Sequence, residues 1–141
     1  SIGSFIQANP GQVNETVKKV VSTAGSYSAV DLYHALHRIK EIHFYILSKM
    51  EKLDFIMLPT VGTEYKIEDV LSNPVKLNKN MGYYTYFANP AGLPVIAVPA
   101  SIKKNGIPFG ISLVAAPFED RKLLHLGRLW QGATEIAAGL H

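Results

Sequence analysis

The chain is 141 residues long and nearly balanced in charge, with 14 lysines and arginines against 11 aspartates and glutamates, 48% hydrophobic residues and no cysteine. This length and composition suit one globular domain with a sizeable core. The lack of cysteine excludes disulfides, thiol nucleophiles and cysteine-based metal sites, so we expect a cytoplasmic protein. The net charge of +3 is dispersed along the chain, and no apolar run is long enough to cross a bilayer. Nucleic acid and membranes are therefore not the expected partners.

Helices are predicted for the first third of the chain. Residues 1–6 are small and apolar and lack an initiating methionine, which suggests a continued helix and a fragment of a longer chain. Asn9 and Pro10 offer a cap residue and a proline at the first helical position, and valines follow at helical spacing to residue 21. Ser28 and Asp31 resemble a capping box. Apolar residues then recur every three or four positions, which predicts a long helix of roughly six turns.

The middle of the chain is less regular. Residues 54–58 form a compact apolar run before Pro59, which is typical of a strand buried on both faces and followed by a loop. A chemically useful loop often follows such a strand. Residues 67–71 are expected to make one or two helical turns, and residues 78–89 are rich in aromatic and small polar side chains.

The last third predicts strands and a helix. Residues 95–98 and 111–115 are expected to pair as antiparallel strands joined through the turn at Asn105 and Gly106. Leucines, Trp130 and other apolar residues at helical spacing predict a terminal helix over 119–140. The whole pattern is α/β, with helices packed on a mixed sheet. About three strands make a thin sheet, so further strands could come from sequence outside this chain.

Few residue patterns here are typical of catalysis. His34 and His37 lie three residues apart, but no glutamate stands where a metal-binding helix would need it, so a polar helix face is the preferred interpretation. The sequence contains no phosphate-binding glycine loop and no nucleophile elbow. Glu68 and Asp69 are more typical of a helix cap or a solvated surface than of an acid/base pair.

An aromatic cluster at residues 83–87 is the most distinctive local feature. It combines three tyrosines, a threonine and a phenylalanine. This composition suits a pocket wall that offers apolar contact and a few hydrogen-bond donors. It equally suits a packed segment whose hydroxyl groups bond to the backbone.

Two further stretches carry a resemblance to a known family. They run from Asn89 through Pro-Ala-Gly-Leu-Pro to Pro99, and from Gly106 through Ile-Pro-Phe-Gly to Leu113. Together they resemble the C-terminal part of the amidase signature family. Asn78, the pair Met81-Gly82, and the Tyr-Thr, Phe and Asn that follow resemble the allophanate hydrolase subgroup in particular. The likeness spans nearly the whole chain, residues 1–141, as the C-terminal portion of an amidase-signature domain.

The resemblance implies an amide hydrolase that uses a Ser-Ser-Lys triad without a metal or an organic cofactor. In the family both serines and the lysine lie in the N-terminal half, and no such glycine- and serine-rich run occurs here. No catalytic residue is therefore assigned in this chain, which alone is expected to be inactive. The implied reaction is the conversion of allophanate to ammonia and carbon dioxide in urea degradation. Any homo-oligomer would form through the missing remainder of the protein.

The resemblance also indicates which residues of this chain bind the small-molecule amide. Tyr84, Thr85 and Asn89 are expected in one wall of the substrate pocket. Family members that take glutamine tend to carry an acid at the position of Gly82, so its absence fits a substrate without an α-amine. Pro90 and Gly92 depart from the subgroup pattern, which leaves the amide substrate open. The alternative is a non-catalytic binding or assembly module that reuses half of the amidase fold.

Overall fold

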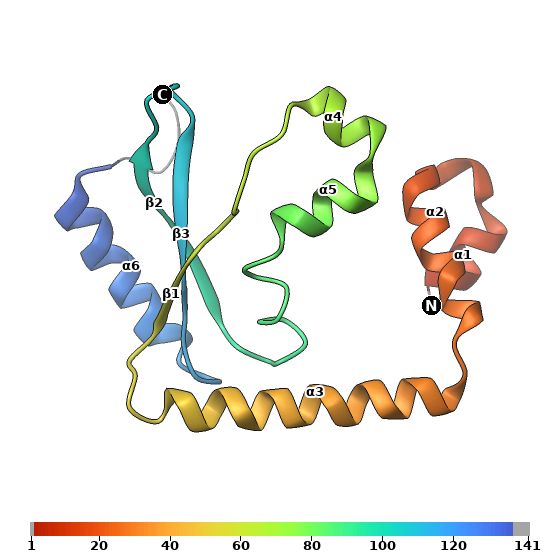
Figure 1. Ribbon diagram of the computed structural model, residues 1–141, viewed down its shortest axis with the longest axis horizontal. Helices are drawn as coiled ribbons and strands as arrows, with labels where there is room; N and C mark the ends of the chain where they lie inside the picture. The colour runs from red at the N-terminus through yellow and green to blue at the C-terminus, as the bar shows by residue number, and fades with distance from the viewer. Residues whose placement is uncertain (1, 137–141) are drawn as a thin grey trace. The chain divides into compact units, whose positions relative to one another are not determined.

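The computed structural model describes residues 2–136 (Figure 1). The chain divides into two compact units, Ser1–Arg38 and Ile39–His141. Helix α3, Ala29–Met50, begins in the first unit and ends in the second. The first unit is otherwise helical, and the second holds the sheet. The predicted α/β class is confirmed.

The first unit contains short helices before α3. They are α1, Ile2–Ala8; η1, Pro10–Gln12; α2, Glu15–Ser22; and η2, Thr23–Ser26. The prediction that one helix starts at Pro10 is wrong. Val13 adopts an extended conformation with φ −112° and ψ 133°, which ends the short 3-10 turn. Asn14 then caps α2, because its side chain accepts a hydrogen bond from the Thr16 amide at 2.9 Å.

The capping box before α3 is confirmed. The Ser28 amide and hydroxyl donate to the Asp31 carboxylate at 2.8 and 2.7 Å, and the Asp31 amide donates to the Ser28 hydroxyl at 3.1 Å. These bonds satisfy donors that an uncapped helix start leaves without partners. The helix then runs for 22 residues, which agrees with the six turns expected from the apolar spacing.

The second unit is built on a three-stranded antiparallel sheet in the order β1-β3-β2. The strands are β1, Ile56–Pro59; β2, Val95–Ile102; and β3, Pro108–Val114. Strand β3 is central, and Val114 pairs with Ile56 on one side and Val95 on the other. The predicted hairpin is confirmed. Gly106 lies in its turn with φ 81°, and the Gly106 amide donates to the Lys103 carbonyl.

The core lies on both faces of β3. Val114 belongs to a cluster with the end of α3 and the segment after α5, and Leu113 belongs to a second cluster with α6. Neighbouring residues of a strand point to opposite faces, so this alternation explains why residues 111–115 are all buried. Strand β1 is different. Ile56 and Leu58 pack on the first cluster, but Met57 is 46% exposed. The prediction that this strand is buried on both faces is therefore wrong for the described residues.

Helix α6, Asp120–Thr134, packs against β2 (Figure 1). Gly127 allows close approach, since a Cβ there would lie 2.8 Å from Ile96 Cδ1. The strand is irregular between Pro99 and Ser101, and the Pro99 carbonyl accepts a hydrogen bond from Trp130 Nε1 at 2.8 Å.

The end of α6 differs from the sequence prediction. The helix stops at Thr134 because Glu135 takes the left-handed conformation, with φ 54°. The predicted helical continuation to residue 136 is therefore wrong. The rest of the expected helix, residues 137–140, lies outside the described residues.

Between β1 and β2 the chain forms two short helices and a series of turns. Helix α4 is Ile67–Ser72 and α5 is Pro74–Met81, with Pro74 at the first helical position. The expected short helix at 67–71 is confirmed. Residues 82–92 then form consecutive turns, which we call the aromatic segment.

Candidate functional site

The aromatic segment carries all three residues that the sequence assigns to substrate binding. Its turns are closed by backbone hydrogen bonds from Thr85 to Gly82 at 2.9 Å, from Ala88 to Thr85 at 3.1 Å and from Gly92 to Asn89 at 3.0 Å. Ala88, Ala91 and Leu93 are buried in the core cluster that also contains Val114. Tyr84, Thr85 and Asn89 therefore belong to one firmly seated irregular segment.

Tyr84 connects this segment to the loop after β1. A Cβ placed on Gly62 would lie 2.7 Å from Tyr84 Cε2 and 3.2 Å from Cδ2, so the ring rests directly on the glycine backbone. The ring of Tyr83 meets the Tyr84 ring edge-on, with centroids 5.2 Å apart. Tyr84 is still 39% exposed, and its hydroxyl makes no hydrogen bond to another residue among 2–136. The ring is thus fixed by packing while the hydroxyl remains available to a ligand.

Thr85 and Asn89 are placed differently from Tyr84. Thr85 is partly buried, and its hydroxyl lies 3.5 Å from the Gly82 carbonyl, a long hydrogen bond within its own turn. Asn89 is exposed. Its carbonyl accepts from Gly92, whereas its side-chain amide has no hydrogen-bond partner within the described part of the chain. Asn89 therefore offers both a donor and an acceptor to a ligand.

A pair of hydroxyl groups at the start of the loop after β1 was not predicted. Thr60 Oγ1 and Ser112 Oγ are 3.0 Å apart, and the Thr60 amide donates to the Gly110 carbonyl at 3.1 Å. Ser112 is 1% exposed, so its hydroxyl needs this partner. The sequence signal was a serine inside an apolar strand, which indicates a buried polar group without naming its partner.

His43 also supports the aromatic segment without having been predicted. Its Nδ1 donates to the Ala91 carbonyl at 2.5 Å. A carbonyl oxygen can only accept, so the proton must lie on Nδ1. The imidazole therefore ties the second half of α3 to the segment that carries Asn89. His43 is one of three histidines on this amphipathic helix, and nothing in the sequence distinguished it for this role.

The loop after β1 is also held at its far end. Lys103 Nζ forms a salt bridge with the Glu64 carboxylate and lies 5.6 Å from the centre of the Phe109 ring. The hydrogen bond from Lys103 lowers the pKa of the Glu64 carboxyl below its ordinary value. Both groups are more than a third exposed, so the pair fixes the loop more than it stabilises the fold.

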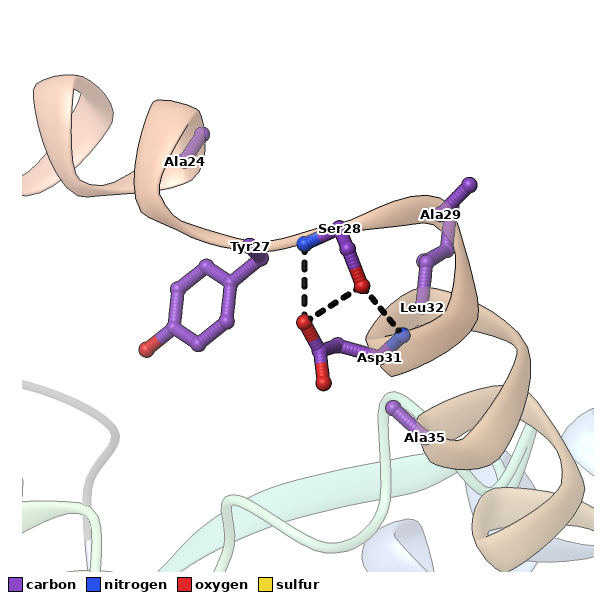
Figure 2. Close-up of a pocket in the computed structure, with 7 residues that line it drawn as sticks. All are labelled: Ala24, Tyr27, Ser28, Ala29, Asp31, Leu32 and Ala35. Carbon is purple, nitrogen blue, oxygen red and sulfur yellow. Dashed lines mark hydrogen bonds between the residues drawn. The ribbon is translucent and has the colours of Figure 1, made fainter.

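The first unit has its own apolar hollow, of about 630 Å³, around the start of α3 (Figure 2). Its lining is Ala24, Tyr27, Ser28, Ala29, Asp31, Leu32 and Ala35. Figure 2 shows that Asp31 is engaged in the capping box. The one carboxylate in the lining is committed to the helix start, so the hollow offers mainly apolar contact.

Within the described residues there is neither a cluster of side chains that could hold a metal ion nor a helix that could span a membrane. Among residues 2–136, no three histidine, aspartate or glutamate side chains gather in a way that could hold a metal ion. None of the helices in that range combines the length and hydrophobicity that crossing a bilayer requires.

Comparisons with known proteins agree on one family. The Amidase family model matches residues 12–124. Urea amidolyase of Saccharomyces cerevisiae is 32% identical over 128 residues, which cover 89% of this chain and 7% of that protein. The glutamyl-tRNA(Gln) amidotransferase A subunit of Bdellovibrio bacteriovorus is 34% identical over 96 residues, covering 67% of this chain and 19% of that protein.

Solved structures give the same result. Kluyveromyces lactis allophanate hydrolase superposes with a TM-score of 0.83 at 28% identity, over 93% of this chain and 22% of that one. The Thermotoga maritima glutamyl-tRNA(Gln) amidotransferase A subunit superposes with a TM-score of 0.66 at 25% identity, over 86% of this chain and 28% of that one. The chain spans a small part of each relative, and it belongs to the amidase family.

Proposed function

We propose that this chain is the C-terminal portion of an amide hydrolase of the allophanate hydrolase type. The observation that carries the proposal is the superposition on allophanate hydrolase, whose TM-score of 0.83 exceeds the 0.66 of the amidotransferase subunit. The similarity to urea amidolyase points to the same substrate class. The proposed reaction is hydrolysis of allophanate to ammonia and carbon dioxide in the cytoplasm, as a step of urea degradation.

In this proposal the chain supplies one wall of the substrate pocket and not the nucleophile. A Ser-Ser-Lys triad elsewhere in the protein attacks the amide carbonyl, with the lysine as the base. Tyr84, Thr85 and Asn89 face the substrate, and Asn89 bonds its polar atoms through an amide that no neighbour among the described residues occupies. The Tyr84 ring on Gly62 supplies a rigid apolar surface. Such preorganised contacts fix the orientation of the reacting carbonyl.

The test compares the full-length protein with residues 1–141 alone. Ammonia release from allophanate is measured for both at equal molar concentration. We expect hydrolysis by the full-length protein and none by the segment. Activity of the purified segment that survives repurification would show that the nucleophile lies within it. An inactive full-length protein that still binds a macromolecular partner would instead support a binding or assembly module.

A further inference from the structure

The loop after β1 is fixed to β3 at its first residue. The pairing of β1 with β3 runs as far as Pro59 and Ile111. The Thr60 amide adds one more bond by donating to the Gly110 carbonyl at 3.1 Å. The Thr60 hydroxyl in turn lies 3.0 Å from the Ser112 hydroxyl. Both the backbone and the side chain of Thr60 therefore determine where the loop leaves the sheet.

The two hydroxyl groups lie on the face of the sheet that carries the aromatic segment. Side chains of a strand alternate between the two faces, so Ser112 shares its face with Val114. Val114 is buried in the same core cluster as Ala88 of the aromatic segment. Ser112 is itself buried, and an unpaired hydroxyl there would be unfavourable. The pair thus holds the Thr60 side chain in one place beneath the aromatic segment.

Gly62, two residues further along the loop, connects this anchor to Tyr84. A Cβ on Gly62 would lie 2.7 Å from Tyr84 Cε2, so the loop backbone and the ring are in direct contact. The salt bridge between Lys103 and Glu64 holds the far end of the loop. The Tyr84 ring therefore rests on the middle of a loop that is anchored on both sides, and a shift of the loop must move the ring.

The Tyr84 hydroxyl is the polar group whose place depends on this loop. It bonds to no other residue in the range 2–136. The strength of a hydrogen bond falls steeply when its distance and angle depart from the optimum. A displaced ring would therefore present its hydroxyl less well to a substrate, and the advantage of a preorganised contact would be reduced.

We propose that Thr60 is a positioning residue for amide hydrolysis: its hydroxyl bond to Ser112 fixes the loop on which the Tyr84 ring rests. The inference rests on the proposed amide hydrolase function. In this role Thr60 touches no substrate and acts only through the position of the Tyr84 hydroxyl.

The experiment asks whether the effect of Thr60 depends on the Tyr84 hydroxyl. In the full-length protein we compare Thr60→Val, which removes the hydroxyl, with Thr60→Ser, which keeps it. We also compare Tyr84→Phe with the double variant Thr60→Val/Tyr84→Phe. The kcat/KM for allophanate and the unfolding temperature are measured for each protein.

Thr134→Val is the matched control for the loss of a threonine hydroxyl. The Thr134 hydroxyl donates to the Trp130 carbonyl at 2.9 Å. Trp130 packs on the core cluster of Leu113, on the other face of β3. We expect this control to keep the kcat/KM of the wild type even if its unfolding temperature falls.

We expect Thr60→Val to lower kcat/KM by about three- to tenfold, as Tyr84→Phe does, and Thr60→Ser to stay within about twofold of the wild type. In the Tyr84→Phe background, Thr60→Val should cost no more than about twofold, because the hydroxyl that it positions is already absent. A general loss of folded protein would lower kcat/KM by the same factor in both backgrounds. If Thr60→Val does not fold, Thr60→Val/Ser112→Ala takes its place, because it leaves no unpaired buried hydroxyl.

The negative results separate this inference from the proposed function. If the wild type hydrolyses allophanate but the losses of Thr60→Val and Tyr84→Phe multiply in the double variant, the positioning role of Thr60 is refuted and the proposed function stands. Wild-type kinetics in Thr60→Val or Tyr84→Phe, or an equal loss in Thr60→Ser, would refute it as well. If the wild type hydrolyses no allophanate, the proposed function and this inference fail together.

Discussion

Tyr84 shows how one side chain can serve structure and ligand binding through different atoms. Its ring rests on Gly62 and meets the edge of Tyr83. Its hydroxyl has no partner within the described residues and is free to contact substrate. Packing of the ring therefore positions the hydroxyl, and the two contributions can be separated by mutation.

We predict that Tyr84→Phe weakens catalysis without weakening the fold. The variant keeps the ring on Gly62 and removes only the hydroxyl, so the unfolding temperature should not change. If the hydroxyl touches substrate, the KM for allophanate rises or kcat falls, by about three- to tenfold for one lost hydrogen bond. Steady-state kinetics and thermal unfolding of the full-length protein provide the measurement. Unchanged kinetics would assign Tyr84 to packing alone.

Sequence reasoning found the aromatic segment but not the residues that hold it. The tyrosine-rich composition and the family motif predicted Tyr84, Thr85 and Asn89 from local residues alone, and their contact with substrate stays a prediction. The contacts of Tyr84 with Gly62 and of His43 with Ala91 join positions far apart in the chain. Such contacts depend on the tertiary fold, and neither a glycine nor a histidine by itself indicates its partner.

At the scale of elements, the capping box makes the start of α3 sensitive to pH. The hydrogen bond from the Ser28 hydroxyl, followed by that from its amide, lowers the pKa of Asp31. A carboxyl with a lowered pKa in the folded state adds stability above its unfolded pKa of about 3.9. That contribution is lost as the pH falls from this value through the folded pKa.

The pH prediction can be followed by hydrogen exchange of the first turns of α3. The Asp31→Asn variant lacks the titrating group. Near pH 7 the amides in the first turns of its α3 should therefore exchange faster than the same amides of the wild type. The ratio of the two rates should start to fall as the pH drops below about 4 and should approach one below the folded pKa of Asp31, where both side chains are neutral. In Ser28→Ala the pH-dependent part should shrink. A ratio that stays constant down to pH 3 would contradict the role of the Asp31 charge.

Two glycines of α6 provide a second prediction about an element. A Cβ on Gly132 would meet no atom within 4 Å, whereas a Cβ on Gly127 would lie 2.8 Å from Ile96 Cδ1. Gly132→Ala should raise the free energy of unfolding by about 0.5–1 kcal/mol through helix propensity. Gly127→Ala should gain less or destabilise, since Ile96 must move. Equal gains in chemical unfolding would show that α6 does not approach β2 this closely.

The element boundaries also show which features adjacent residues predict and which they do not. The capping box and the Asn105-Gly106 turn formed as predicted, because both depend on a few adjacent residues. The predicted start of α2 was wrong. The Asn14 side chain caps this helix, whereas Asn9 makes no side-chain cap and Pro10 begins only a short 3-10 turn. The exposure of Met57 could not be predicted, since an apolar run does not reveal how many neighbours its strand has.

At the scale of the whole molecule, we propose that this chain forms one wall of an amide hydrolase pocket. The chain covers 22% of the allophanate hydrolase structure on which it superposes. The proposed nucleophile lies in the remainder, and the proposed contacts to the amide lie here. Activity must then depend on residues of this chain even though none of them performs the covalent step.

The most direct measurement is the steady-state hydrolysis of allophanate by the full-length protein and its Asn89→Ala variant. Asn89 is exposed and its side chain bonds to nothing within residues 2–136, so the fold should be unaffected. We predict ammonia release by the wild type and a loss of about tenfold in kcat/KM in the variant, with an unchanged unfolding temperature. Equal kcat/KM values for the two proteins, or no hydrolysis by the wild type, would contradict the claim.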